Sequence, residues 1–221
     1  MILTLIQYVL KAAIRDRMVV AMIAAMVLGC SLSVFLGSSA VTEQDQFSLA
    51  FASAGLRFTG MIGIVLFIVF FIRRSIDSRD LEFLLSRPVG RIQFLLSYAA
   101  AFSFIALIVT LAQTLGLYIL GPHLFGEGAI LWCFSMMIEN VIIANTAFFF
   151  ALFLSSAAGA SLGVLGFYVL GRMMGQILGI LQAGGGGGIT DLLAQIMNVI
   201  SIITPRLDPV SYTHLTLPTK A

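Results

Sequence analysis

The chain has 221 residues, of which 60% are hydrophobic and 10% are charged, and its mean hydropathy is +1.07. These values exclude a soluble globular domain and are typical of a membrane protein. The net charge of +2 comes from basic residues beside apolar stretches and not from a basic groove, so nucleic acid is not an expected partner. Cys30 and Cys133 both fall in apolar stretches and are interpreted as ordinary membrane-helix residues.

The N-terminal segment 2–14 places its apolar residues on one helical face, and Lys11, Arg15 and Arg17 gather at its far end. This pattern favours an amphipathic helix that lies along the cytoplasmic surface of a membrane. The alternative is an extension of the first span, which we expect at 18–38. A cleavable signal peptide competes with that span, but the apolar run is longer than its usual apolar core.

Four further apolar runs follow the first span and are interpreted as spans two to five. Before them, residues 39–54 are polar and lack Lys and Arg, so we interpret this segment as a connector outside the membrane. The second span is expected at 58–72, beginning slightly earlier, with Arg57 near the outer interface. The third, fourth and fifth spans are expected at 92–120, which Gly121-Pro122 ends, at 130–154 and at 159–182.

Positive residues divide unevenly between the two sides of these spans. The N-terminal segment and the Arg73–Arg91 loop are basic, whereas the connectors 39–54 and 121–128 contain no Lys or Arg. By the positive-inside rule, the N-terminus and the basic loop are cytoplasmic. The predicted class is therefore an all-α polytopic membrane helix bundle with five spans in the sequence.

The loop from Arg73 to Arg91 carries five of the twelve basic residues. Asp77 or Ser78 can cap a short helix there, and Pro88 ends it because the preceding residue is pushed away from helical geometry. Leu81, Leu84 and Leu85 share one face of this helix, 77–87. A short helix that is charged on one side and apolar on the other is suited to dock on another protein.

The string Asp80-Leu81-Glu82-Phe83-Leu84-Leu85-Ser86-Arg87-Pro88-Val89-Gly90-Arg91 resembles the coupling-helix signature of ABC-2-type transporter permeases. That signature commonly reads Gly-Thr-Leu-Glu-x-Leu-Leu-Ser-x-Pro-Val-x-Arg after the second span. Arg79-Asp80 replaces the usual Gly-Thr here, and Tyr98 stands where a lysine is frequent.

The resemblance implies a membrane-spanning permease subunit, usually of an exporter, in the inner or plasma membrane. It implies two permease copies and two ABC ATPase subunits that hydrolyse ATP, with no cofactor bound by this chain. The docking surface for the ATPase would comprise Asp80, Leu81, Glu82, Leu84, Leu85, Arg87, Pro88 and Arg91. Similar permeases have a sixth span, which we expect to be missing after residue 209.

Three polar residues lie inside the predicted spans. Glu139 and Asn140 are in the fourth and Arg172 is in the fifth. Ionisable groups in a membrane usually face a bundle interior or water, so these residues are candidates for a translocation path. Glu139 could line that path, pair with Arg172 or couple to protons; alternatively it bonds a neighbouring helix while Arg172 reaches outward. Interhelical hydrogen bonds are also expected from Gln113, Thr114 and Asn145.

Glycines recur every fourth residue in the fifth span, at Gly171, Gly175 and Gly179, with a similar step at Gly159 and Gly163. Small residues at this spacing allow helix backbones to approach closely. The pattern predicts either an interface that slides during transport or static packing within one subunit.

No catalytic constellation or nucleotide-binding motif is found, so an enzyme is not predicted and ATP hydrolysis is assigned to another polypeptide. The glycines at 184–188 lack the Gly-Lys-Ser/Thr of a phosphate loop and are interpreted as a hinge. An ion-coupled secondary transporter using Glu139 is the alternative function, although no inverted repeat is found.

The permease domain is assigned to 1–209. Residues 210–221 break the hydrophobic pattern, and 210–219 resemble one reading frame of a sequencing-library adapter. We expect this tail to be non-native.

Overall fold

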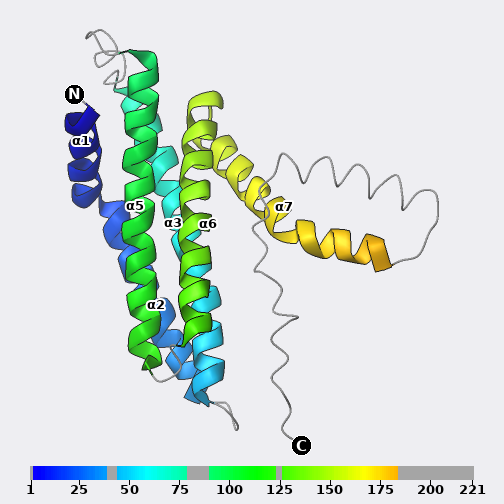
Figure 1. Cartoon of the computed structure of the whole chain (residues 1–221). Coiled ribbons are helices and arrows are strands. Elements are labelled where there is room, and N and C mark those ends of the chain that lie inside the picture. Colours follow the sequence, from blue (N-terminus) through cyan, green and yellow to red (C-terminus); the bar gives the residue numbers. More distant parts are fainter. Residues whose placement is uncertain (1, 39–43, 79–89, 123–125, 184–221) are drawn as a thin grey trace, which may run out of the picture. The chain divides into compact units, whose positions relative to one another are not determined.

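The computed structural model describes residues 2–38, 44–78, 90–122 and 126–183 of the chain. This part of the chain is built from helices (Figure 1). In order they are α1 (Ile2–Arg15), α2 (Arg17–Ser38), α3 (Gln44–Asp77), α5 (Arg91–Leu120), α6 (Glu127–Phe153) and α7 (Ala157–Ala183). The chain divides into a first unit, Met1–Val164, and a second unit, Leu165–Ala221, and each is described by itself.

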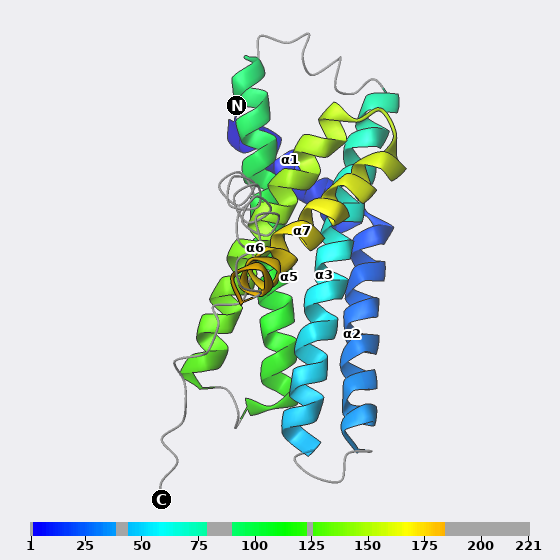
Figure 2. The ribbon, with the colours of Figure 1, turned by 90° about the vertical axis from the view of Figure 1, so that its right-hand side faces the viewer.

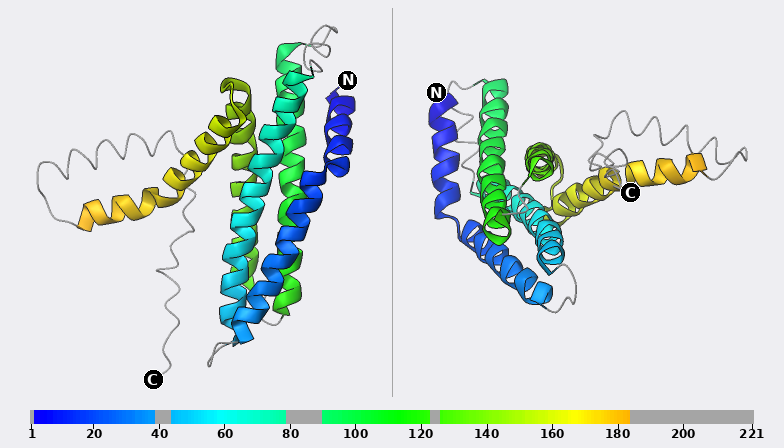
Figure 3. Two further views of the ribbon diagram at one scale, coloured as in Figure 1. Left: turned by 180° about the vertical axis from the view of Figure 1, so that it is seen from behind. Right: turned by 60° about the horizontal axis from the view of Figure 1, so that its bottom comes forward.

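The core of the first unit is a bundle of α2, α3, α5 and α6, in which each helix runs antiparallel to the one before it (Figures 1 and 3). The helix α3 is central, because it packs against α2, α5 and α6. In the most apolar window of α3, 61% of residues are buried, against 17% for α2. The helix α2 is therefore peripheral and presents most of its apolar surface outward.

The helices α2, α3, α5 and α6 are each long and apolar enough to cross a membrane. The 22 residues of α2 give about 33 Å of helix, close to a hydrocarbon core of about 30 Å. These features confirm the all-helical class and are consistent with a multi-pass membrane protein. The apolar part of α7 with described surroundings, Ala157–Met173, is shorter, so the fifth span stays a prediction.

The second span is longer than its sequence indicates. Residues 39–54 are predicted as a connector, but α3 begins at Gln44 and continues without a break to Asp77. Alanine and leucine, both strong helix formers, recur among the polar residues of 44–54, so this stretch continues the helical hydrogen bonding of the apolar run. The prediction of a connector beyond residue 43 is therefore wrong.

Close packing between α2 and α3 depends on Gly63. A Cβ at this position would overlap the side chain of Met22, so the absence of one lets the two helices approach. Near the C-terminal end of α3, stacked and edge-on aromatic rings connect three helices of the core. Phe102 of α5 contacts Phe71 of α3 edge-on, with ring centroids 5.9 Å apart, and Phe148 of α6 at 5.3 Å.

The N-terminal helix is distinct from the first span. The helical structure is interrupted at Asp16, between α1 and α2, and Figure 2 shows that the axes of these two helices are not collinear. The helix α1 packs along α5, where Val9 and Ala13 are buried. The interpretation of α1 as a simple extension of the first span is therefore wrong.

Candidate functional site

Polar and charged side chains gather at two places in the first unit. The first, here called the central polar layer, lies among α3, α5 and α6 and comprises Arg57, Thr110, Gln113, Trp132, Glu139 and Asn140. The second, here called the elbow cluster, lies where α1 meets α2 and comprises Arg15, Asp16, Arg17 and Arg74.

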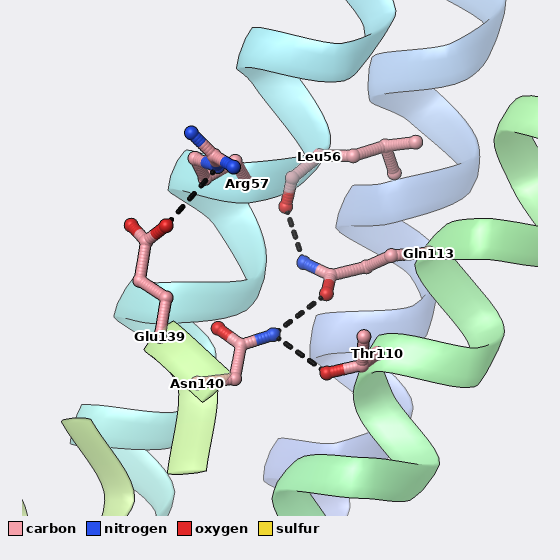
Figure 4. A network of polar contacts seen from close by, with 6 residues as sticks. All are labelled: Leu56, Arg57, Thr110, Gln113, Glu139 and Asn140. Carbon is pink, nitrogen blue, oxygen red and sulfur yellow. Dashed lines mark hydrogen bonds and ion pairs between the residues drawn. The ribbon is translucent and has the colours of Figure 1, made fainter. Parts of the chain in front are cut away.

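An ion pair between Arg57 of α3 and Glu139 of α6 forms one half of the central polar layer (Figure 4). The Nε of Arg57 is 3.4 Å from Oε2 of Glu139, and the two residues are 6% and 3% exposed. The guanidinium also lies over the ring of Trp132, 4.8 Å from its centroid. A buried cation and a buried carboxylate neutralise each other here, and the aromatic face adds cation–π attraction.

Amide groups form the other half of the layer. The Asn140 Nδ2 donates to Oγ1 of Thr110 and to Oε1 of Gln113, both at 2.9 Å. The Gln113 Nε2 in turn donates to the backbone carbonyl of Leu56 in α3, at 2.7 Å (Figure 4). One continuous chain of hydrogen bonds thus links α6 to α5 and α5 to α3.

Gly60 makes the last of these bonds sterically accessible. In a helix, the carbonyl of Leu56 already accepts from the amide of residue 60, so a second donor must approach beside that residue. A Cβ at Gly60 would overlap the Gln113 amide. Glycine at this position therefore opens the path by which Gln113 reaches the α3 backbone.

The structure brings Glu139 and Asn140 together in the bundle interior, as the sequence predicts. The partner of Glu139 is Arg57, which is predicted near the outer interface but is buried well inside α3. Arg172, which was one of several partners considered for Glu139, is half-buried and belongs to the second unit, so that pairing is not tested. The roles of Glu139, Asn140 and Arg172 in a translocation path stay predictions.

Two of three predicted interhelical hydrogen bonds are confirmed. Gln113 bonds α3 and α6, and Asn145 of α6 donates to Oγ of Ser103 in α5 at 2.9 Å. Thr114 instead donates to the carbonyl of Thr110 in its own helix, so its predicted role is wrong. A threonine hydroxyl can reach the carbonyl four residues earlier, which satisfies it locally.

Asp16 organises the elbow cluster. Its Oδ1 accepts from the amide of Met18 at 3.0 Å and so caps α2, while Oδ2 lies 2.7 Å from Nη2 of Arg74 near the end of α3. Burial, the largest single influence, raises the pKa of the Asp16 carboxyl. The Met18 amide and the hydrogen bond and charge of Arg74 together outweigh it, so the pKa lies below its ordinary value.

Arg73 ties the end of α3 to the end of α6. Its Nη2 donates to the carbonyl of Ala151 at 2.9 Å, in the last turn of α6. A cation at this point satisfies a carbonyl that the helix leaves without a partner and complements the helix dipole. The two neighbouring arginines therefore connect α3 to two different helices.

The predicted docking helix, 77–87, lies almost wholly outside the described residues. Its proposed first residue, Asp77, belongs to the end of α3, and Arg91 begins α5. Docking residues Asp80 to Pro88 therefore stay predictions. Tyr98, which departs from the family pattern, is buried against Phe94, with ring centroids 4.4 Å apart.

The glycine series of the fifth span is only partly described. Gly171 is buried, and Gly175 and Gly179 lie in α7. In the earlier step, Gly163 packs against α6, because a Cβ there would stand 3.0 Å from the ring of Phe150. This contact fits the packing interpretation at Gly163 and does not test the sliding one.

Sequence reasoning assigns no site role to Arg57, Trp132 or Thr110. A signal for Arg57 is present, since a lone arginine thirteen residues into an apolar helix needs a partner. Among the described residues, no group of three His, Cys, Asp or Glu side chains could hold a metal ion, and Cys30 and Cys133 are free thiols.

Comparisons with protein-family models, curated proteins and solved structures give no match to this chain.

Proposed function

We propose that the chain is the membrane subunit of an ABC-2-type transporter, an export permease driven by a separate ATPase. In this proposal, its N-terminus and the 79–89 segment face the cytoplasm. The ATPase grips the helix predicted at 77–87, with Leu81, Leu84 and Leu85 as the apolar contact.

The observation that carries the proposal is how the helices on either side of that segment are anchored. The end of α3 and the start of α5 lie at the end of the bundle where α6 also finishes (Figure 1). There Arg73 holds α6 and Arg74 holds the start of α2. A push on the segment would therefore reach four helices through direct contacts.

The central polar layer supports a bundle that moves between discrete arrangements. Its donors and acceptors match each other along α3, α5 and α6, so a small slide would break several bonds together. Such networks favour a few defined states over continuous deformation. ATP-driven movement of α3 and α5 would then change access to the bundle interior.

Co-purification with a candidate ABC ATPase tests the proposal; a P-loop ATPase encoded beside this gene, if one is found there, is the first candidate. The native chain should retain the ATPase, and Leu84→Asp should abolish the complex while leaving membrane insertion intact. Ser86→Asp is the matched control, because it adds the same carboxylate on the opposite face of the predicted helix. Equal retention by the Leu84→Asp variant would contradict the docking mechanism.

The alternative, an ion-coupled secondary transporter, would use Glu139 as the coupling group. That carboxylate is committed to Arg57 in this structure, which favours a structural role. Transport by reconstituted chain alone, driven by an ion gradient without ATPase or ATP, would support the alternative.

A further inference from the structure

We propose that an apolar groove between α2 and α5 binds one hydrocarbon chain of a membrane lipid and recognises that chain whatever its headgroup. The groove lies within the first unit, and residues of α1, α2, α3 and α5 line it. This inference needs no ATPase and stands apart from the proposed function.

The groove exists because α2 and α5 present matching apolar stripes to each other but make little contact. Its two walls are Val19, Met22, Ile23 and Met26 of α2, and Ile105, Ile108, Val109 and Ala112 of α5. Both sets follow i, i+3, i+4, i+7 spacing, which places each set on one face of its helix. The helix α2 packs extensively on α3 and only slightly on α5. Two faces of a kind that normally pack together are therefore held apart.

The bottom of the groove belongs to the packed core. Ile64 and Phe67 of α3 form it, and they are only 1% and 3% exposed. Met22 is held on the same side, because it occupies the space that a Cβ of Gly63 would fill. The α2 wall is thus fixed by its packing on α3, and it cannot close the groove without losing that contact.

The size and lining of the groove restrict what can fill it. Its volume is about 130 Å³, and every lining side chain is apolar. Enclosed apolar cavities of comparable size, about 150 Å³, stay dry and accept compact apolar guests. An empty groove would leave its lining without van der Waals partners on one side. The occupant is therefore apolar and slender, and a helix of a second copy, about 10 Å across, would not fit.

The rim of the groove faces away from the bundle. Ile23 and Ile108, one on each wall, are about half exposed, at 51% and 49%. Because α2, α3 and α5 are each long and apolar enough to cross a membrane, lipid chains would surround this rim. A lipid chain can thus enter from the side without passing through the bundle.

The groove spans part of one leaflet. Its α2 wall begins at Val19, near the start of α2, and ends at Met26, before the middle of that 22-residue helix. Seven residues of helical rise cover about 10 Å, against about 30 Å for the whole hydrocarbon core. No charged side chain is among the lining residues. The site therefore holds part of one acyl chain and makes no contact that would select a headgroup.

Photolabelling of the full chain in phosphatidylcholine vesicles tests this proposal. A small fraction of the lipid carries a diazirine in its acyl chain, and mass spectrometry of peptide fragments locates the label. Leu28, an outward residue of α2, reports the surrounding lipid, whereas the buried Met22 and Met26 report the groove. We expect each methionine to be labelled at least about half as strongly as Leu28. Labelling of both methionines below about a tenth of that at Leu28 would overturn the proposal.

A matched pair of variants tests whether the label reaches the methionines through the groove. Ala112→Phe places a ring in the lining, whereas Ala100→Phe places one on a part of α5 outside it, and both alanines are exposed. We expect Ala112→Phe to lower the ratio of methionine to Leu28 labelling about fivefold, and Ala100→Phe to leave it unchanged. An unchanged ratio in the Ala112→Phe variant would equally contradict the proposal. Because Leu28 is measured in the same molecule, poor insertion of a variant lowers both labels and preserves the ratio.

A change of headgroup tests recognition of the chain alone. Phosphatidylglycerol with the same acyl chains replaces phosphatidylcholine in both the vesicle and the diazirine probe. We expect the same ratio of methionine to Leu28 labelling, because the lining holds no charged group. Methionine labelling that occurs with only one of the two headgroups would show that the chain is not the group recognised.

Discussion

The central polar layer and the elbow cluster both contain an arginine–carboxylate pair, but their surroundings differ. Arg57 and Glu139 are both buried, and neighbouring amides extend their contacts across three helices. At the elbow, the side chain of Asp16 is 7% exposed but that of Arg74 is 64% exposed. Both pairs therefore connect helices, but the pair in the central polar layer is enclosed by the bundle, whereas the pair at the elbow is open to solvent on the Arg74 side.

Breaking the buried ion pair should have the largest effect. Glu139→Leu deprives the buried Arg57 of its carboxylate partner, which should cost about 3–5 kcal/mol of stability. Arg57→Leu/Glu139→Leu removes both charges and should recover most of that loss. Thermal unfolding of the purified chain in detergent measures both. If the double variant is as unstable as the sum of the single variants, the two side chains do not form a stabilising pair.

Filling the space beside the Leu56 carbonyl should have the next largest effect. Gly60→Ala forces the Gln113 amide away and leaves buried polar groups with fewer bonds, at about 1–3 kcal/mol. Gly55→Ala is the matched control, because a Cβ there has open space and alanine favours helix. Chemical unfolding should separate the two variants; equal stabilities would show that Gln113 does not need this path.

Removing one hydrogen-bonding side chain of the layer should matter less. Asn140→Ala deletes two donated bonds between α6 and α5, and interhelical bonds in membrane proteins average about 0.6 kcal/mol each. Combined with Gln113→Ala, the loss should be smaller than the sum of the two single losses, because the residues share a bond. Strict additivity in a double-mutant cycle would contradict the network.

The elbow should give the smallest effect and depend on pH. Asp16→Ala removes both the cap and the ion pair and should cost about 1 kcal/mol, whereas Asp16→Asn keeps the capping oxygen and should cost less. The pKa of Asp16 is lowered by folding, so its stabilisation is present above the ordinary carboxyl range. That stabilisation is lost as pH falls through the lowered value, below about pH 4.

Stability measured from pH 3 to pH 7 checks the elbow prediction. The native chain should lose stability on acidification more steeply than the Asp16→Asn variant, which has no carboxyl to titrate at this position. Identical profiles would show that Asp16 does not contribute through its charge.

Local patterns predicted much of the fold. The bounds of α2, α5 and α6 agree with the predicted spans within about three residues, because long apolar runs end at clear breaks such as Gly121-Pro122. The start of α3 was not predicted, since polar residues occur in exposed helix as readily as in a connector. The burial of Arg57 was also missed, because its partners Trp132 and Glu139 lie more than seventy residues further along the chain.

The sequence indicated which polar residues face the bundle interior, but it did not indicate which of them contact each other. Intramembrane polar residues signal interior contacts, and Glu139, Asn140 and Gln113 were identified on that ground. Which of them meet depends on the register of α3, α5 and α6, and helix periodicity does not encode that register. The Asp16–Arg74 contact is of the same kind, because it joins residues 58 positions apart.

The central claim is that the end of the bundle where α3 ends and α5 begins faces the cytoplasm. Accessibility labelling at the two ends of the bundle tests this claim most directly. Gly90 and Gly126 precede α5 and α6 at opposite ends, both are exposed, and a Cβ at either meets open space. Gly90→Cys and Gly126→Cys are made separately in a chain whose Cys30 and Cys133 are changed to serine. With an impermeant maleimide on intact cells, we expect labelling of the Gly126→Cys variant, and of the Gly90→Cys variant only after permeabilisation. Labelling of the Gly90→Cys variant in intact cells would contradict the account.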